Sequence, residues 1–337
     1  MKNKKKFIIN FIIIFVVLLL VLYFSLKDSF NEIISDIINM NPLCVIAAII
    51  TLCLCRCLMA ITHYMVIRLN NEKVPYYKCL MINFIILFFH GITPFAGGGQ
   101  PMEVYYLHKE NIRVTKATNI TLQNFIVYQI TFVFIGILAL VYNAYFNLFP
   151  KDHLIKRLVV LGFTINILVL VITFVLSFGR KFSKNICDKL ISIGINMKII
   201  HDEDKIRDRI NGYLNGFYNN ALELGKHKFK VFKMILIDFL AIIILYSMPY
   251  FISLGFGFKL NFINVLVTTA YVMTIGSFVP IPGGTGGIEY GFIFFFGYLI
   301  RGKVVNAIML IWRFVSYYLG MIFGAIVLSM YRKKDKI

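Results

Sequence analysis

Five ionisable side chains interrupt otherwise apolar segments of this sequence. They are Arg56, Glu103, Asp238, Glu289 and Arg313. An ionisable group at the centre of a bilayer costs about 2.5 to 3.5 kcal/mol on insertion scales, so such residues face a bundle interior or a wet cavity and pair with one another. Both signs of charge are present. The sequence therefore predicts a polar site at membrane depth, held by ion pairs or used to bind a charged group.

Arg313 is the residue that we expect to matter most. A guanidinium forks onto two phosphate oxygens in a way that the ammonium of lysine cannot, so Arg313 is a candidate phosphate clamp and Arg56 a second one. A structural ion pair is the alternative for Arg313. Arg56 and Asp238, on corresponding segments of the two halves of the chain, form an alternative structural pair.

Two glycine-rich loops interrupt apolar segments at related positions. The first covers residues 94–103 and the second residues 280–289, and a shift of 186 positions superposes a proline, two glycines and the glutamates Glu103 and Glu289. A glycine run frees backbone N–H and C=O groups, which are tolerated at membrane depth only inside protein or beside a wet cavity. The glycines expected to approach a ligand closely are Gly97, Gly98, Gly99, Gly283, Gly284, Gly286 and Gly287.

The two loop glutamates admit two interpretations. Each lies near the expected start of a helix, where free N–H groups and the helix dipole stabilise a carboxylate. Alternatively, Glu103 and Glu289 hold Arg56 or Arg313 in place, or bind a cationic part of a lipid head group.

Composition identifies the broad class. Of 337 residues, 59% are hydrophobic and 15% are charged, and the mean hydropathy is +0.78, which excludes an ordinary soluble domain. The formal net charge is +19, but the basic residues collect between apolar spans and at the chain ends. That distribution indicates membrane topology and contact with anionic lipid, and we expect no nucleic-acid partner.

The sequence predicts no metal, no cofactor and no catalytic residue. Cys53, Cys55 and Cys57 alternate in an apolar helix without nearby histidines at metal-like spacing, and His90 and His108 are isolated. The second glycine loop lacks the Lys-Ser/Thr of a nucleotide-binding loop.

The apolar segments predict an all-α polytopic membrane protein with about six full spans and two re-entrant hairpins, arranged as inverted-topology repeats. Residues 1–178 form the first half with its loop at 93–103, residues 179–230 a basic amphipathic connector, and residues 231–337 the second half with its loop at 279–289. The expected full spans are 7–26, 43–67, 117–146, 158–178, 231–256 and 304–330, and the shorter segments are 79–92 and 263–279.

The positive-inside rule predicts the orientation. Placing the N-terminal lysines, the links at 68–78 and 108–116, the connector and the C-terminal tail in the cytoplasm puts both termini there. The connector, with 11 Lys or Arg against 6 Asp or Glu, is expected on anionic lipid. We expect the first apolar run to be retained as a helix of a plasma-membrane protein, because no small-residue cleavage site follows it.

Several motifs together resemble one known family. Thr93-Pro94, the run 97–102, the run 105–107, the second loop 282–289, Arg313 and Tyr317 are similar to the lysylphosphatidylglycerol synthetase transmembrane family, the flippase-like membrane domain of the multiple peptide resistance factor. The resemblance covers essentially the whole chain. Because either loop alone is a weak motif, its specificity lies in the combination of the two.

The resemblance implies a membrane domain of two inverted halves that binds or moves an anionic or aminoacylated phospholipid, with a role in membrane charge and in resistance to cationic peptides. A second copy of the chain and a separate aminoacyl-lipid synthase are the candidate protein partners. The resistance factor continues into a soluble transferase that uses charged tRNA, so we expect only its transport half here. Phosphatidylglycerol lysyltransferase activity and ion-coupled transport of a small solute are the alternatives.

Overall fold

The computed structural model describes residues 35, 37–149, 153–196 and 203–334, and within these ranges every regular element is helical. The predicted span at 7–26 lies outside the described residues. Four helices are long and apolar enough to cross a membrane, and three shorter apolar helices accompany them. The chain is a polytopic membrane protein of all-α class, as its composition predicts.

The first half of the chain folds as a span, a helix pair around the first glycine loop, and two further long helices. Asn41 accepts a hydrogen bond from the Leu43 N–H and caps the first described helix, which has proline at its start. The elements are α3 (Pro42–Leu69), α4 (Tyr76–Ile92), the short 3₁₀ turn η1 (Pro94–Ala96), α5 (Gly99–Lys109), α6 (Val114–Phe146) and α7 (His153–Phe178).

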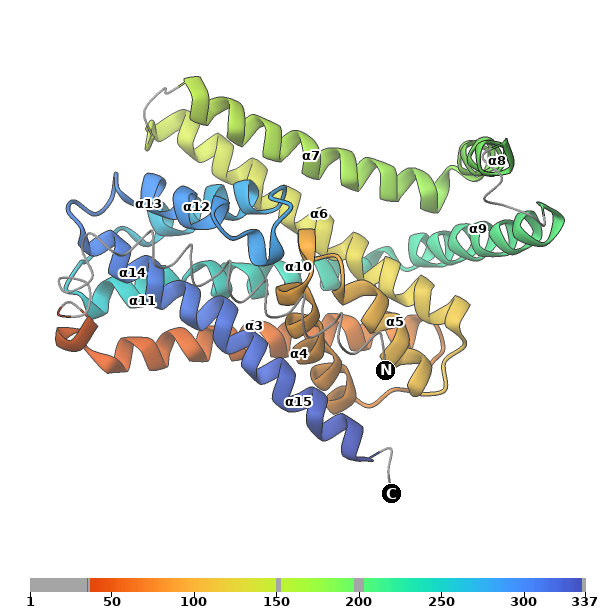
Figure 1. Ribbon diagram of the computed structural model, residues 1–337, viewed down its shortest axis with the longest axis horizontal. Helices are drawn as coiled ribbons and strands as arrows, with labels where there is room; N and C mark the ends of the chain where they lie inside the picture. Colours follow the sequence, from red (N-terminus) through yellow and green to blue (C-terminus); the bar gives the residue numbers. More distant parts are fainter. Residues whose placement is uncertain (1–34, 36, 150–152, 197–202, 335–337) are drawn as a thin grey trace.

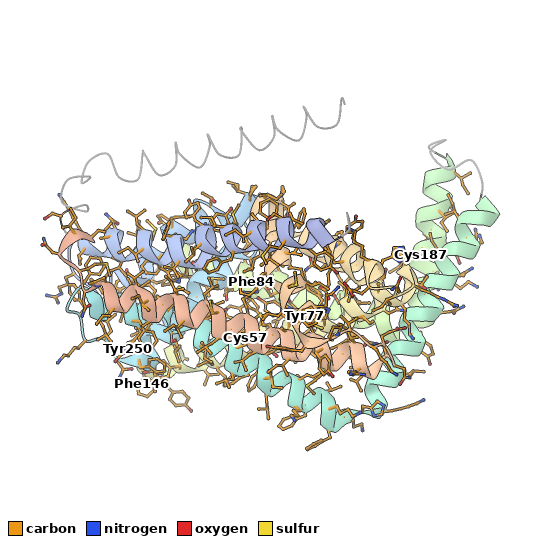
Figure 2. All side chains as sticks on the ribbon, turned by 90° about the horizontal axis from the view of Figure 1, so that it is seen from below. Cys57, Tyr77, Phe84, Phe146, Cys187 and Tyr250 are labelled. Carbon is orange, nitrogen blue, oxygen red and sulfur yellow. The ribbon has the colours of Figure 1, made fainter. Side chains whose placement is uncertain are left out.

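The expected connector contains two helices, α8 (Arg180–Asn196) and α9 (Glu203–Lys226). Both are amphipathic, and Arg207 of α9 pairs with Asp188 of α8 at 2.8 Å. The two helices form a hairpin that projects at one end of the bundle (Figure 1). Figure 2 places Cys187 of α8 at the end opposite to Phe146 and Tyr250.

The second half follows the same order of elements. Its first span consists of α10 (Lys228–Tyr246) and α11 (Met248–Gly255). Its helix pair consists of α12 (Phe262–Gly276) and α13 (Gly287–Phe296), on either side of the turn η2 (Pro282–Gly284). Its last span consists of α14 (Val304–Arg313), the π-helical segment η3 (Phe314–Leu319) and α15 (Gly320–Lys334). The spans predicted at 231–256 and 304–330 are confirmed as the long apolar segments Lys228–Gly255 and Val304–Tyr331, and each contains one irregularity. Pro249 lacks an N–H, so the first of them breaks at Ser247, and the second widens into a π-helix directly after Arg313.

Each half packs its short helix against a long helix of the other half. The short helix α4 lies against α15 of the second half, and the short helix α12 lies against α6 of the first half, while α3 packs along α10 and α11. Gly324 allows the first of these contacts, because a Cβ there would overlap the Phe84 carbonyl oxygen. Neither half therefore has a complete core without the other.

Contacts at the two ends of the bundle show where each helix pair begins and finishes. At one end Lys78, near the start of α4, pairs with Glu110 just after α5 at 2.6 Å, and Tyr331 of α15 donates to the same carboxylate. At the other end Tyr142 of α6 donates to Asn264 near the start of α12 at 2.8 Å. The α4–α5 pair thus opens at one end of the bundle and the α12–α13 pair at the opposite end, as the course of the chain in Figure 1 shows.

The two glycine loops meet where the two helix pairs end, and both carry exposed residues, among them Phe95 and Ile281. The turns η1 and η2 touch each other, and η2 also touches α4. The backbone relates the loops by 188 positions, since the turns begin at Pro94 and Pro282 and the following helices at Gly99 and Gly287. The shift of 186 positions inferred from the residue types is therefore wrong by two residues at the loops.

Candidate functional site

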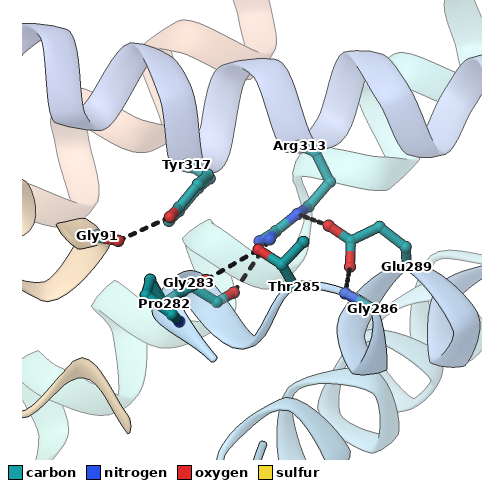
Figure 3. Close-up of polar contacts among 8 residues, drawn as sticks. All are labelled: Gly91, Pro282, Gly283, Thr285, Gly286, Glu289, Arg313 and Tyr317. Carbon is teal, nitrogen blue, oxygen red and sulfur yellow. Dashed lines mark hydrogen bonds and ion pairs between the residues drawn. The ribbon is translucent and has the colours of Figure 1, made fainter. Parts of the chain in front are cut away.

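Arg313 is buried in an ion pair beside the second loop (Figure 3). Its Nε donates to Glu289 Oε1 at 2.7 Å and its Nη2 donates to the Gly283 carbonyl oxygen at 3.0 Å. Its side chain is 5% exposed. The other carboxylate oxygen of Glu289 accepts the Gly286 N–H at 2.6 Å, so Glu289 both caps α13 and holds Arg313. Both structural interpretations of Glu289 are thereby confirmed, as is the ion pair of Arg313.

Tyr317 joins the second loop to the first. Its hydroxyl donates to the Gly91 carbonyl oxygen at 2.7 Å, at the end of α4, and its ring lies 4.5 Å from the guanidinium carbon of Arg313. The ring also covers Gly283, whose φ of +66° suits glycine and whose Cβ, if present, would overlap the ring. Figure 3 shows this bridge between the two halves.

The first loop is built differently. Phe95, in place of a glycine, takes the left-handed conformation with φ of +53° and is 62% exposed. Thr93 accepts the Gly98 N–H at 2.8 Å, and Gly99 starts α5 without a side-chain cap. His90 lies against Gly99, leaving no room for a Cβ there, and its Nε2 is buried without a hydrogen-bond partner in the described part of the chain. A strained bulky residue beside an uncapped helix start is a feature of functional sites.

Glu103 does not match Glu289 in position or partner. It is the fifth residue of α5, whereas Glu289 is the third residue of α13, so the prediction that they are equivalent is wrong. Glu103 Oε1 lies 3.2 Å from His63 Nε2 of α3 and 3.5 Å from the amide nitrogen of Asn124 on α6. Among the described residues it contacts neither arginine at ion-pair distance.

Arg56 and Asp238 lie in the same interior region without a close bond between them. They interact electrostatically, and Arg56 also acts on Tyr128 of α6 and His90 of α4. No ion pair within 4.0 Å joins Arg56 to any acidic group of the described chain, and its Nε is buried without a hydrogen-bond partner. Asp238 is 3% exposed, and its Oδ1 is also buried without a hydrogen-bond partner in the described chain. The alternative of a tight structural pair is therefore wrong at this geometry.

The structure thus separates the predicted site residues into two groups. Arg313, Glu289 and Tyr317 are brought together around the second loop, while Arg56 and Glu103 lie in the first half with separate partners. Sequence reasoning missed His63, Asn83 and Asn124, although polar residues within apolar spans are the signal that would have found them. It also dismissed His90 as isolated.

The two arginines differ in what they can still bind. Arg313 uses Nε and Nη2 for protein partners, and within the described residues only Nη1 has none. Arg56 forms no ion pair with an acidic group of the described chain, and its Nε is buried without a hydrogen-bond partner. Arg56 is partly buried and has no ion pair among the described residues, so it has more free donors for an anion than Arg313 and is the stronger candidate anion ligand of the two.

Comparison with known proteins gives one family. The family model described as "Lysylphosphatidylglycerol synthase TM region" matches residues 8–324. A UPF0104 membrane protein of Pyrococcus horikoshii is 24% identical over 298 residues, covering 86% of this chain and 87% of that protein. A UPF0104 membrane protein of Methanocaldococcus jannaschii is 25% identical over 317 residues, covering 90% of this chain and 89% of that protein.

Proposed function

Because this chain belongs to the lysylphosphatidylglycerol synthase TM region family, we propose that it is a flippase or scramblase that moves an anionic or aminoacylated phospholipid across the membrane. Phosphatidylglycerol and lysylphosphatidylglycerol are the lipid types proposed. The lipid would alter membrane charge and with it resistance to cationic peptides.

One observation carries this proposal. Two glycine loops, reached from opposite ends of the bundle, touch each other, and Arg56 lies in the same half as the first loop without an ion pair among the described residues. Irregular backbone at membrane depth needs a protein or wet surrounding. Paired interrupted segments in the two halves of a membrane protein are where transporters place their substrate sites.

The proposed path concerns only the polar end of the lipid. The acyl chains stay in the bilayer while the phosphate meets Arg56, and the uncapped start of α5 at Gly99 offers N–H groups and the positive end of the helix dipole. Arg313 holds the second loop in place through Glu289 and the Gly283 carbonyl oxygen. In this scheme the α4–α5 and α12–α13 pairs are re-entrant hairpins of inverted repeats, and rocking of the halves alternates access.

The surroundings of the site belong to the same proposal. Both termini and the α8–α9 hairpin lie on the cytoplasmic side of the plasma membrane, and the basic residues of the hairpin contact anionic lipid. A second copy of the chain and a separate aminoacyl-lipid synthase are the proposed protein partners.

Reconstituted vesicles test the proposal. Phosphatidylglycerol with a fluorescent acyl label is loaded in both leaflets, and dithionite quenches what reaches the outer leaflet. We expect the wild-type chain to make nearly all of the label accessible. Arg56→Ala should slow this about ten- to a hundredfold, because a charge-assisted hydrogen bond contributes about 1.5 to 3 kcal/mol.

Arg68→Ala is the matched control. Arg68 is on the same helix, but it is exposed and hydrogen-bonded to the Tyr64 hydroxyl at 2.9 Å, so its loss should leave the rate unchanged. Equal effects of the two substitutions, or no lipid movement by the wild type, contradict the proposal. Transfer of lysine from charged tRNA to phosphatidylglycerol, or uptake of a water-soluble solute, in the same vesicles would support the two alternative functions instead.

A further inference from the structure

The buried glutamates of the two halves differ in charge compensation. Glu289 faces Arg313 at 2.7 Å, whereas the only basic group within ion-pair distance of Glu103 in the described chain is His63. Glu103 is 4% exposed and His63 is fully buried. A carboxylate in such a place is costly without a cation or a bound proton. The charge state of His63 therefore decides that of Glu103.

Asn83 fixes that charge state. Its side-chain nitrogen donates to the Cys79 carbonyl oxygen at 3.0 Å and lies 3.3 Å from His63 Nδ1. The reverse orientation of the amide would set two oxygens against each other, so the nitrogen faces the ring. A donor opposite Nδ1 requires that Nδ1 carry no proton. His63 is then neutral, with its one N–H on Nε2, the nitrogen that lies 3.2 Å from Glu103 Oε1.

The other neighbours of Glu103 are neutral as well. Asn124 and Thr121 come from α6, and the Cys79 thiol comes from α4. The charged residues near this end of the bundle pair among themselves, Lys78 with Glu110 and Lys116 with Glu72. Since no cation of the described chain offsets Glu103, its carboxylate is neutralised by a proton taken from water.

We infer that Glu103 is a proton-binding site of this membrane protein, with neutral His63 and Asn83 as its positioning residues, and that the bound proton couples movement of the α4–α5 hairpin to the transmembrane proton gradient. One proton from the aqueous phase converts the carboxylate into a carboxylic acid, which packs between α3 and α6 as in this structure. Losing the proton restores a charge that needs water, which favours displacement of α5 from α3.

Infrared difference spectroscopy of the chain in lipid nanodiscs tests the proton site directly. We expect a protonated-carboxyl band that persists at a pH where surface carboxyls are ionised. Glu103→Gln should remove that band, and Glu110→Gln, whose glutamate pairs with Lys78, should retain it. His63→Phe should shift the band, because it removes the polar N–H group that lies 3.2 Å from the Glu103 carboxyl. A spectrum in which Glu103→Gln changes nothing overturns the inference.

The coupling rests on the proposed lipid transport and has its own readout. If one proton moves with each lipid, a pH difference of one unit across the vesicle shifts the steady-state distribution of labelled phosphatidylglycerol between leaflets about tenfold. In the Glu103→Gln variant, the distribution of labelled lipid between the leaflets should not depend on the pH difference. In the Glu110→Gln variant, the distribution should depend on the pH difference as in the wild type. Wild-type vesicles that equilibrate lipid without any response to pH overturn the coupling and leave the proposed function standing. If no lipid moves at all, the proposed function and its coupling fail together, and the infrared band alone decides the proton site.

Discussion

Arg56 and Arg313 show how surroundings assign different roles to one residue type. Arg313 is bound on two sides by Glu289 and the Gly283 carbonyl oxygen, and its guanidinium lies near the Tyr317 ring, so it fixes the second loop against the first. Arg56 has no ion pair in the described chain. We therefore assign the anion-binding role chiefly to Arg56 and a positioning role chiefly to Arg313.

The buried Arg313–Glu289 ion pair should contribute to stability. Arg313→Ala and Glu289→Gln should each lower the free energy of unfolding in mixed micelles by about 3 to 5 kcal/mol, because each leaves one buried charge without its partner. Arg301→Ala, at an exposed position, should change it by less than about 0.5 kcal/mol. The double variant Arg313→Ala with Glu289→Gln removes both charges. Its loss should be smaller than the sum of the single losses, and additive losses would argue against a buried ion pair.

At the residue scale, the sequence predicted which buried ionisable residues matter better than it predicted which residues they contact. The ion pair of Arg313 and the capping role of Glu289 followed from residue type and position. The partner of Glu103 did not, because the loops align at 188 rather than 186 positions, which places this glutamate more than half a helical turn further into its helix. The contact of Glu103 with His63 depends on how α5 packs against α3, which the sequence does not give.

At the scale of elements, irregular backbone interrupts several of the apolar segments. The break at Ser247, the π-helical segment after Arg313 and the two loop turns all lie within or beside apolar segments. π-helical segments within α-helices frequently accompany functional sites. These features place backbone groups and side chains where a straight helix could not.

The second loop depends on a glycine that a side chain cannot replace. Gly283→Ala adds a Cβ at φ of +66° and against the Tyr317 ring, so we expect a loss of stability larger than the 1 to 2 kcal/mol or so that a left-handed alanine costs by itself. Gly257→Ala, at φ of +82° with open space around it, reports that backbone cost alone. Thermal unfolding of both variants in detergent measures the difference. Equal losses would mean that the ring does not press on Gly283.

The boundaries of the elements were largely predictable. Hydropathy placed the described spans and both short helices within a few residues of their ends, since polar links and prolines mark those ends. The π-helical segment has no comparable signal in residue types, because it arises where α14 and α15 must fit around the first half.

At the scale of the whole molecule, the halves exchange partners and open their helix pairs at opposite ends. The pairing of α4 with α15 and of α12 with α6 means that motion of one half changes the walls of the other. The contact between the turns η1 and η2 lies where both helix pairs end. Such an arrangement suits alternating access at a shared interior site.

Cysteine labelling tests the orientation of the two ends. In a cysteine-free background, Lys73→Cys lies in the exposed link before α4 and Arg301→Cys in the exposed link before α14. We expect an impermeant maleimide to label Arg301→Cys in intact cells and Lys73→Cys only after permeabilisation, because the positive-inside rule predicts that the basic link at 68–78 faces the cytoplasm. Labelling of both positions from one side would refute inverted helix pairs.

The central claim is that a lipid phosphate is bound between the two glycine loops by Arg56. The most direct measurement is an experimental structure of the chain in phosphatidylglycerol nanodiscs. The account predicts head-group density within hydrogen-bond reach of Arg56, between η1 and η2, with the acyl chains leading out to the bilayer. Lipid density confined to the outer surface of the bundle, with Arg56 paired to Asp238 and protein filling the space between the loops, would contradict it.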